Sequence, residues 1–301
     1  MRIARALRRW VVRAVLLFWA AAFCMDAAGI QALRASAAVP RDARTGLMRG
    51  AEPVRIERGR AGACLLLHGW VSTPADFADL PRAMDEAGWD VCAPLHPGHG
   101  TVPSDLKGVT ADDLLRAARE QYASLRRSHG RVVLVGISMG GTIATLLSVS
   151  QPPDGLVLVG PFYEVAYKPH YVLPPRWWYA MLSPFVRYVA RPAGLVSVNR
   201  PEGRAGVIAY GAFPMDAADA LFELRRRCVE QVDPARLTMP VLMVYSRADE
   251  ASSPAAMEDF FGKLPVGRKR RAVFERSNHH IFRDYDREEA IQAVVLFLQD
   301  L

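Results

Sequence analysis

Short apolar runs alternate with helical patterns along most of the chain. The apolar runs predict buried strands at residues 63–67, 90–93, 132–135, 156–159, 241–245 and 271–274. Helices are predicted between them, over residues 74–88, 111–127, 139–149, 254–264 and 287–298. Because strands and helices alternate, the connections are expected to be right-handed crossovers. The pattern therefore predicts an α/β fold, with a mostly parallel sheet covered by helices on both faces.

The alternation stops between Pro161 and Val232. This stretch is rich in proline and aromatic residues and has two helical patches, at residues 177–189 and 217–230. An insertion into one core explains the break better than two consecutive domains do. The predicted layout is an N-terminal segment (1–38), a first part of the core (39–160), the insertion (161–232) and a second part of the core (233–301).

The N-terminal segment has a basic start and then an apolar run. Five arginines lie between Arg2 and Arg13, no acid precedes Asp26, and residues 14–25 are apolar. This order is typical of a signal peptide, and Ala35 to Ala37 offers an A-x-A cleavage site. The run is shorter than the roughly 20 residues of a spanning helix. We expect a cleaved signal or an uncleaved membrane anchor, hence a periplasmic or membrane-anchored enzyme with a cytoplasmic N-terminus. The alternative is an amphipathic helix in a cytoplasmic protein.

Composition and charge narrow the class further. The 301 residues are 51% hydrophobic and 23% charged, as in a globular protein. Part of the net charge of +7 lies in the N-terminal segment, and another basic run, residues 268–271, predicts a solvated turn. A broad basic face interleaved with aromatic residues is missing, so nucleic-acid binding is not expected. Cys64 and Cys92 lie in predicted strands, as core thiols or, in an oxidising compartment, as a disulfide.

The sequence G-x-S-x-G at Gly136 to Gly140 joins a predicted strand to a predicted helix. At such a sharp turn the flanking glycines relieve crowding and leave the serine hydroxyl exposed. The start of the helix also favours negative charge developing nearby. Ser138 is therefore the predicted nucleophile.

A serine hydroxyl needs a base, and the base needs an acid that orients it. Asp249 follows the predicted strand at 241–245, and His279 and His280 lie in the loop after the next predicted strand. The ends of parallel strands meet at one edge of a sheet, so these side chains are expected to lie near Ser138. Asp249 is the predicted acid. Both histidines are candidates for the base. We favour His279, with His280 behind it or facing the acid loop.

His68, Gly69 and Trp70 end the first predicted strand. Glycine permits a close backbone approach there, so the amides of Trp70 and Met139 are expected to form the oxyanion hole. His68 is expected to be structural, and His99 to brace a tight turn. The remaining histidines, His96, His129 and His170, show no ligand spacing, so no metal or other cofactor is predicted.

At these residues the chain resembles the bacterial carboxylesterase and monoacylglycerol lipase branch of the α/β-hydrolase superfamily. The matching stretches are LLLHGW (65–70), APLHPGHG (93–100), GISMGG (136–141), YSRADE (245–250) and SNHHIFRD (277–284). The resemblance covers about residues 52–301 and implies an α/β-hydrolase fold with a small helical cap at 161–232. The last motif of the branch places the base at His279 and an apolar residue at the next position, where this chain has His280.

The resemblance and the residues together predict a serine esterase or lipase that acts through an acyl-enzyme on a small-molecule or lipid ester. An acyltransferase or thioesterase would use the same residues, and a non-catalytic binding protein is a further alternative. Aromatic residues of the insertion are expected to line an acyl site or to form its own core. They are Phe162, Tyr163, Tyr167, Tyr171, Trp177, Trp178, Tyr179, Phe185 and Tyr188.

Overall fold

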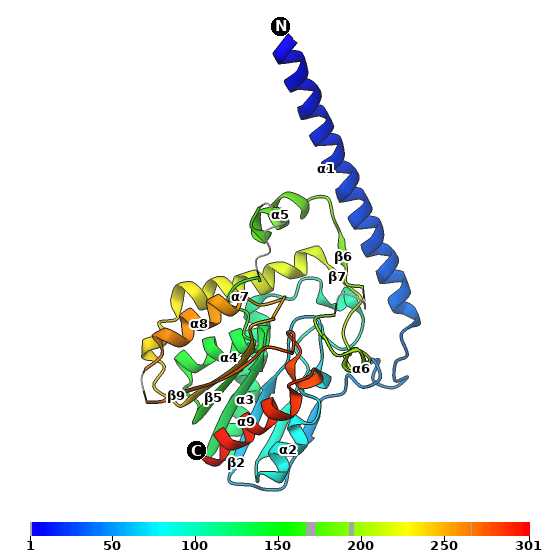
Figure 1. Ribbon diagram of the computed structural model, residues 1–301. Helices are drawn as coiled ribbons and strands as arrows, with labels where there is room; N and C mark the ends of the chain where they lie inside the picture. The colour runs from blue at the N-terminus through cyan, green and yellow to red at the C-terminus, as the bar shows by residue number, and fades with distance from the viewer. Residues whose placement is uncertain (1, 167–172, 193–195, 266) are drawn as a thin grey trace.

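The computed structural model describes residues 2–166, 173–192, 196–265 and 267–301. A seven-stranded sheet lies at its centre, in the order β1-β3-β2-β4-β5-β8-β9 (Figure 1). All neighbouring strands are parallel except β1, which is antiparallel to β3. The strands are β1 (Val54–Ile56), β2 (Gly62–Leu67), β3 (Asp90–Ala93), β4 (Arg131–Ile137), β5 (Gly155–Val159), β8 (Val241–Ser246) and β9 (Lys269–Phe274).

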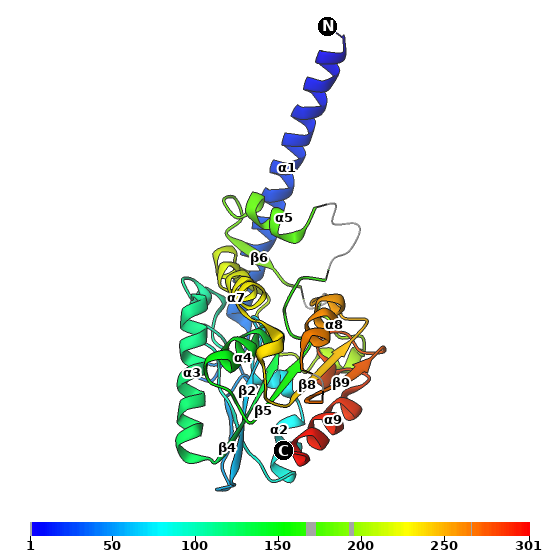
Figure 2. The same cartoon turned by 90° about the vertical axis from the view of Figure 1, so that its left-hand side faces the viewer.

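Helices cover both faces of the sheet, as Figure 2 shows. One buried cluster joins the sheet to α3 (Ala111–Ser128), α4 (Met139–Ser150), α7 (Ala218–Gln231) and α8 (Pro254–Lys263). The other joins it to α2 (Leu80–Glu86) and α9 (Arg287–Gln299). Side chains alternate between the two faces along each strand. The predicted α/β fold, with a mostly parallel sheet, is confirmed.

This alternation separates the two strand cysteines. Cys64 packs in the cluster with α2 and α9, whereas Cys92 packs in the cluster on the opposite face. All four cysteines of the chain are free thiols. The alternative of a disulfide between Cys64 and Cys92 was therefore wrong, because the two side chains point to opposite sides of the sheet. Burial also raises the pKa of both thiols.

Two predicted helices are wrong in part. Residues 74–88 form a 3₁₀ turn, η2 (Pro74–Phe77), followed by α2, because Pro81 lacks the N–H that a helix interior requires and Ala78 has a φ of 48°. Residues 177–189 form only the end of α5 (Pro175–Leu182) and then part of a strand, β6 (Tyr188–Ala190). Pro184 cannot continue the helix, and β6 pairs with β7 (Ala212–Pro214) instead.

The basic run at 268–271 was predicted to be a turn, but most of it is strand. Lys269 to Arg271 belong to β9, which lies at the edge of the sheet. Charged side chains on an edge strand oppose pairing with another chain, which explains this placement. The remaining short elements are η1 (Ser36–Ala38), η3 (Pro103–Leu106), α6 (Pro201–Arg204), η6 (Met215–Ala217), η7 (Pro234–Arg236) and η8 (Ile281–Arg283).

The N-terminal segment forms one long helix, α1 (Arg2–Ala35), which projects from the body (Figures 1 and 2). The stretch Arg8–Ala38 is long and apolar enough to cross a membrane, and 6% of an apolar 18-residue segment within it is buried. The second half of α1 packs against β6. There Asp26 accepts hydrogen bonds from the backbone and the guanidinium of Arg187. Gly29 lies so close to Tyr188 that an added Cβ would come within 1.8 Å of its carbonyl oxygen.

Candidate active site

Ser138 lies at a tight turn between β4 and α4. Its φ is 52° and its ψ is −117°, a conformation that costs backbone energy in a non-glycine residue. The glycines around it are required by space. A Cβ on Gly136 would lie 2.3 Å from the carbonyl oxygen of Gly140, and a Cβ on Gly140 would lie 1.9 Å from that of Leu67. The sequence G-x-S-x-G thus folds into a strained turn that presents the serine.

Backbone hydrogen bonds hold this turn in place. The amide of Ser138 donates to Val159 O at 3.0 Å, and its carbonyl accepts from the amides of Phe162 and Thr142, both at 3.1 Å. The serine is thereby tied to the ends of two strands and to its own helix. Its side chain faces a cavity of about 190 Å³. The lining residues are Gly69, Trp70, Val71, Asp76, Ile137, Ser138, Phe162, Arg191, Phe213, Leu221, Ala251, Ser252, His279 and His280.

His279 lines this cavity and pairs with Asp249. Its Nδ1 lies 2.7 Å from Oδ2 of the carboxylate, and both side chains are buried. Oδ1 of Asp249 accepts the amides of Ala251 and Ser252, both at 2.8 Å, which fixes the carboxylate behind the imidazole. Burial alone would lower the pKa of His279, but the charge and hydrogen bond of Asp249 outweigh it and raise that pKa.

His280 faces a second buried carboxylate. Its Nδ1 lies 3.3 Å from Oδ1 of Asp76, within ion-pair distance but without hydrogen-bond geometry. Asp76 belongs to η2, so His280 does not face the acid loop, which was one of the two predicted placements. Burial opposes ionisation of Asp76, yet the charged groups around it, His280 first and then Arg283, keep its pKa below the usual range.

The structure thus brings Ser138, His279, His280 and Trp70 to one cavity, with Asp249 directly behind His279. Among the described residues, no hydrogen bond joins Ser138 to His279. Such bonds are often long before a substrate binds. A second cavity, between α7 and α8, is lined by Tyr163 of the predicted aromatic residues but by none of the predicted catalytic or oxyanion-hole residues.

The amides of Trp70 and Met139 are available for an oxyanion. Within the described part of the chain, neither N–H donates to another residue. Met139 is the first residue of α4, whose N–H groups have no partner inside the helix. Gly69 lies close to the nucleophile, since an added Cβ would contact Ser138 Cβ at 3.4 Å. Trp70 and Met139 therefore lie beside the serine, and the oxyanion hole stays a prediction.

Three other histidines form a buried cluster behind the loop after β2. His68 accepts the amide of His96 at 3.1 Å, and His96 lies 3.2 Å from the carbonyl of His68. His99 accepts the amide of Val71 at 3.2 Å. Burial lowers the pKa of all three, that of His96 to about 3 and that of His99 to about 4. These neutral rings brace the loop that carries Trp70.

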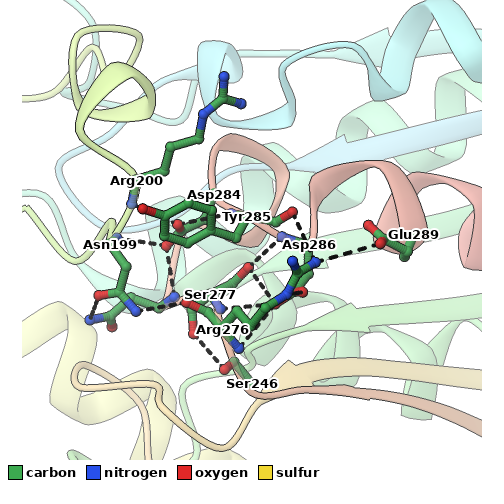
Figure 3. A network of polar contacts seen from close by, with 10 residues as sticks. Asn199, Arg200, Ser246, Arg276, Ser277, Asp284, Tyr285, Asp286 and Glu289 are labelled. Atoms are coloured by element: carbon green, nitrogen blue, oxygen red, sulfur yellow. Dashed lines mark hydrogen bonds and ion pairs between the residues drawn. The ribbon is translucent and has the colours of Figure 1, made fainter.

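Two aspartates hold the loop that carries His279, as Figure 3 shows. Asp284 is fully buried and accepts the amides of Asn199, Arg200, Asn278 and Tyr285 at 2.7 to 2.9 Å. Asp286 accepts the amide and the hydroxyl of Ser277, both at 2.8 Å. Asp284 was noted only as part of a motif, and Asp286 was missed. Their spacing after the histidines gives no sign of these bonds.

The cavity wall differs from the predicted aromatic lining. Of the described candidates only Phe162 lines the cavity, joined by Trp70 and by Phe213, which was not predicted. Trp177, Trp178 and Phe185 are exposed, while Tyr163 stacks on Phe260 instead. Tyr167, His170 and Tyr171 lie outside the described residues. The polar members Asp76 and Arg191 were also missed, because no sequence pattern marks them.

Comparisons with known proteins show which sequences this chain is similar to. Residues 59–286 match the sequence family described as serine aminopeptidase, S33. The chain is 27% identical to a thermostable monoacylglycerol lipase from Bacillus sp. (strain H-257) over 83% of its length and 95% of the relative. It is 24% identical to a carboxylesterase from Bacillus subtilis (strain 168), over 81% and 95%.

Solved structures show the same fold. A monoacylglycerol lipase from Paleococcus ferrophilus superposes with a TM-score of 0.69 at 19% identity, covering 83% of this chain and 98% of that one. A structure from a study of LipS and LipT, two metagenome-derived lipolytic enzymes, gives 0.73 at 22% identity, covering 84% and 98%. The chain therefore belongs to the serine aminopeptidase S33 family of α/β-hydrolases.

Proposed function

We propose that this protein hydrolyses carboxylic esters through an acyl-enzyme formed on Ser138. The observation that carries the proposal is the joint position of the strained serine and the His279–Asp249 pair at one cavity. The names of the relatives, a monoacylglycerol lipase and a carboxylesterase, support an ester as the substrate. Fold alone would not support that choice.

The proposed reaction has two halves. Ser138 Oγ attacks the ester carbonyl while His279 Nε2 takes the hydroxyl proton, and the Trp70 and Met139 amides stabilise the oxyanion. The tetrahedral intermediate expels the alcohol, which leaves with that proton. Water then attacks the acyl-enzyme with His279 as base, which releases the carboxylic acid and restores the serine. Asp249 keeps the imidazole in the tautomer that this requires.

Labelling with a fluorophosphonate tests the nucleophile directly, because the reagent modifies activated serines. We expect one label on Ser138 and release of p-nitrophenol from short-chain p-nitrophenyl esters. Absence of both in folded protein would refute the proposal. A panel of acyl chain lengths then reports how far the cavity extends.

We further propose that the insertion at 161–232 acts as a cap. Arg191, Phe213 and Leu221 belong to it and line the cavity beside Ser138. The core would then consist of residues 39–160 and 233–301. A replacement of α5 (Pro175–Leu182), away from these three residues, should alter substrate preference less than substitution of the three themselves.

We propose that α1 is an uncleaved membrane anchor. Several of its large apolar side chains are exposed, among them Trp10, Leu17 and Phe23, at 67%, 71% and 74%. The basic residues before them favour a cytoplasmic N-terminus. Phe185 of the insertion packs against Phe18 and Trp19 of this helix and is itself partly exposed, so the insertion adds apolar surface beside α1.

A further inference from the structure

Arg191 is the one arginine in the described lining of the cavity that contains Ser138. It directly follows β6, and its amide donates to Gly211 O at 2.7 Å, so a paired strand end fixes its backbone. Its side chain reaches the same space as Ser138 and His279. A guanidinium offers five N–H donors in a fixed planar arrangement and stays charged at neutral pH.

No described residue pairs with this guanidinium. Within the described part of the chain it forms neither a hydrogen bond nor an ion pair, and Arg191 is half-buried. Burial lowers its pKa, and the charge of Asp76 offsets that effect only in part. Arg283 is the other described arginine whose pKa is lowered, and unlike Arg191 it donates a hydrogen bond to the carbonyl of Ala75.

Asp76 forms no ion pair with Arg191, and two other groups interact with the Asp76 carboxylate. His280 Nδ1 lies 3.3 Å from its Oδ1, and the charge of Arg283 also acts on the same carboxylate. Asp76 lies in the same cavity lining and acts on Arg191 through its charge, without a hydrogen bond or ion pair between them. The N–H donors of Arg191 are therefore used by no described residue and lie next to the nucleophile, where an anionic group could accept them.

We propose that Arg191 binds an anionic oxygen group, a carboxylate or a phosphate, that the ester substrate carries in addition to its reacting carbonyl. The proposal rests on the proposed ester hydrolysis and names its substrate class: esters that carry one anionic group near the scissile bond. Guanidinium binds either group in a bidentate manner, which would orient the ester relative to Ser138. A neutral ester of equal length would lack this contact.

The test uses full-length protein and pairs of charged and neutral esters. The mono-p-nitrophenyl ester of glutaric acid, which has a carboxylate on the acyl side, is compared with the neutral p-nitrophenyl valerate. 2-Acetoxyethyl phosphate, which has a phosphate on the alcohol side, is compared with the neutral butyl acetate. We expect kcat/KM to favour the charged member of at least one pair by about 10- to 100-fold, the range of one charge-assisted contact. The pair that shows the preference identifies the anion.

Variants assign that preference to the guanidinium. Arg191→Met should remove it, because kcat/KM for the charged ester should fall by about 10- to 100-fold more than kcat/KM for the neutral ester, chiefly through a higher KM. Arg191→Lys keeps the charge without the planar donors and should restore part of the preference. Arg116→Met, on the exposed face of α3, is the matched control for loss of one positive charge and should change neither pair.

The outcomes separate this proposal from the proposed function. Wild-type protein that labels with fluorophosphonate yet shows no preference for either charged ester overturns the anion site alone. Equal losses toward charged and neutral esters in folded Arg191→Met also overturn it, because Arg191 would then be merely structural. Failure to label or to cleave any of the four esters refutes the ester hydrolase. In that case calorimetric binding of glutarate and of phosphate to wild type and Arg191→Met decides the anion site independently.

Discussion

The rings of His279 and His280 lie 5.6 Å apart, centre to centre, and nearly perpendicular, and each faces a different buried carboxylate. His279 has Asp249 at 2.7 Å in hydrogen-bond geometry, whereas His280 has Asp76 at 3.3 Å without it. Adjacent residues in the loop thus point to separate partners, so neither ring can replace the other. We predict that His279 alone is the base.

His279→Ala should be nearly inactive, with a loss in kcat on the order of 10⁶-fold, as for the bases of well-studied triads. His280→Ala should keep activity within about a hundredfold, because its ring acts through Asp76 and the cavity wall (this range comes from supporting residues at metal sites). Rates should be compared at equal folded fraction, measured by circular dichroism. An active His279→Ala together with an inactive His280→Ala would show that His280, and not His279, is the base.

Ser138→Ala should abolish ester hydrolysis and fluorophosphonate labelling while leaving the fold intact. Its side chain makes no hydrogen bond with another described residue, so stability should change by no more than about 1 kcal/mol. Ser150→Ala, at the exposed end of the same helix, is the control and should keep full activity. Turnover of a p-nitrophenyl ester by Ser138→Ala would contradict the mechanism.

The pH profile should follow the titration of His279. The base must be neutral to accept a proton, and Asp249 raises its pKa above the ordinary value of 6.5. kcat/KM should therefore fall as the pH drops through a midpoint above 6.5. Asp249→Asn removes the charge, so the midpoint should move to lower pH while the rate falls on the order of 10⁴-fold, as in serine proteases. A midpoint that stays in place would mean that another group controls the limb.

Asp284→Asn should loosen the loop that carries His279. An amide has one acceptor oxygen, so its NH₂ group would face some of the backbone N–H donors that the carboxylate now accepts. We expect the free energy of unfolding to fall by about 1.5–3 kcal/mol and kcat to fall more than KM rises. Glu289→Gln, an exposed neighbour in the same network, should change stability by less than about 0.5 kcal/mol. Equal melting temperatures for the two variants would exclude this positioning role.

Gly29→Val should detach α1 from β6, because a Cβ there overlaps the carbonyl of Tyr188. The variant should stay in the membrane fraction but become more sensitive to protease near residues 35–40. Ala28→Val, one position earlier and exposed, is the control and should behave as wild type. Full-length wild-type protein recovered only in the soluble fraction would refute the proposed anchor.

Periodicity and turn chemistry were enough to predict the six parallel strands of the sheet and most helices that cover it, but not the antiparallel edge strand β1. Buried parallel strands are continuous apolar runs, and the helices between them have one apolar stripe, so both signals were strong. The helix predicted at 177–189 failed because β6 is only three residues long and is defined by its partner β7, which lies 22 or more residues later. Such a strand has no local signature.

The site divides in the same way. Ser138, Asp249 and His279 follow strands of a parallel sheet, so their meeting at one edge could be predicted from order along the chain. Asp76 and Arg191 could not be found in this way. Asp76 lies in the 3₁₀ turn η2 and Arg191 directly follows the short strand β6. Only tertiary packing brings the two residues to the cavity.

The contact of α1 with β6 determines how the enzyme would meet its substrates. The ring of Phe185 lies 4.5 Å from that of Trp19, which is in the middle of the apolar stretch of α1. With α1 in a bilayer, the insertion would be drawn against the lipid headgroups rather than hang from a flexible tether. Ester molecules would then arrive by two-dimensional diffusion along the surface. The arginine at the far end of β6 would select among them by charge, at a fixed height above the lipid.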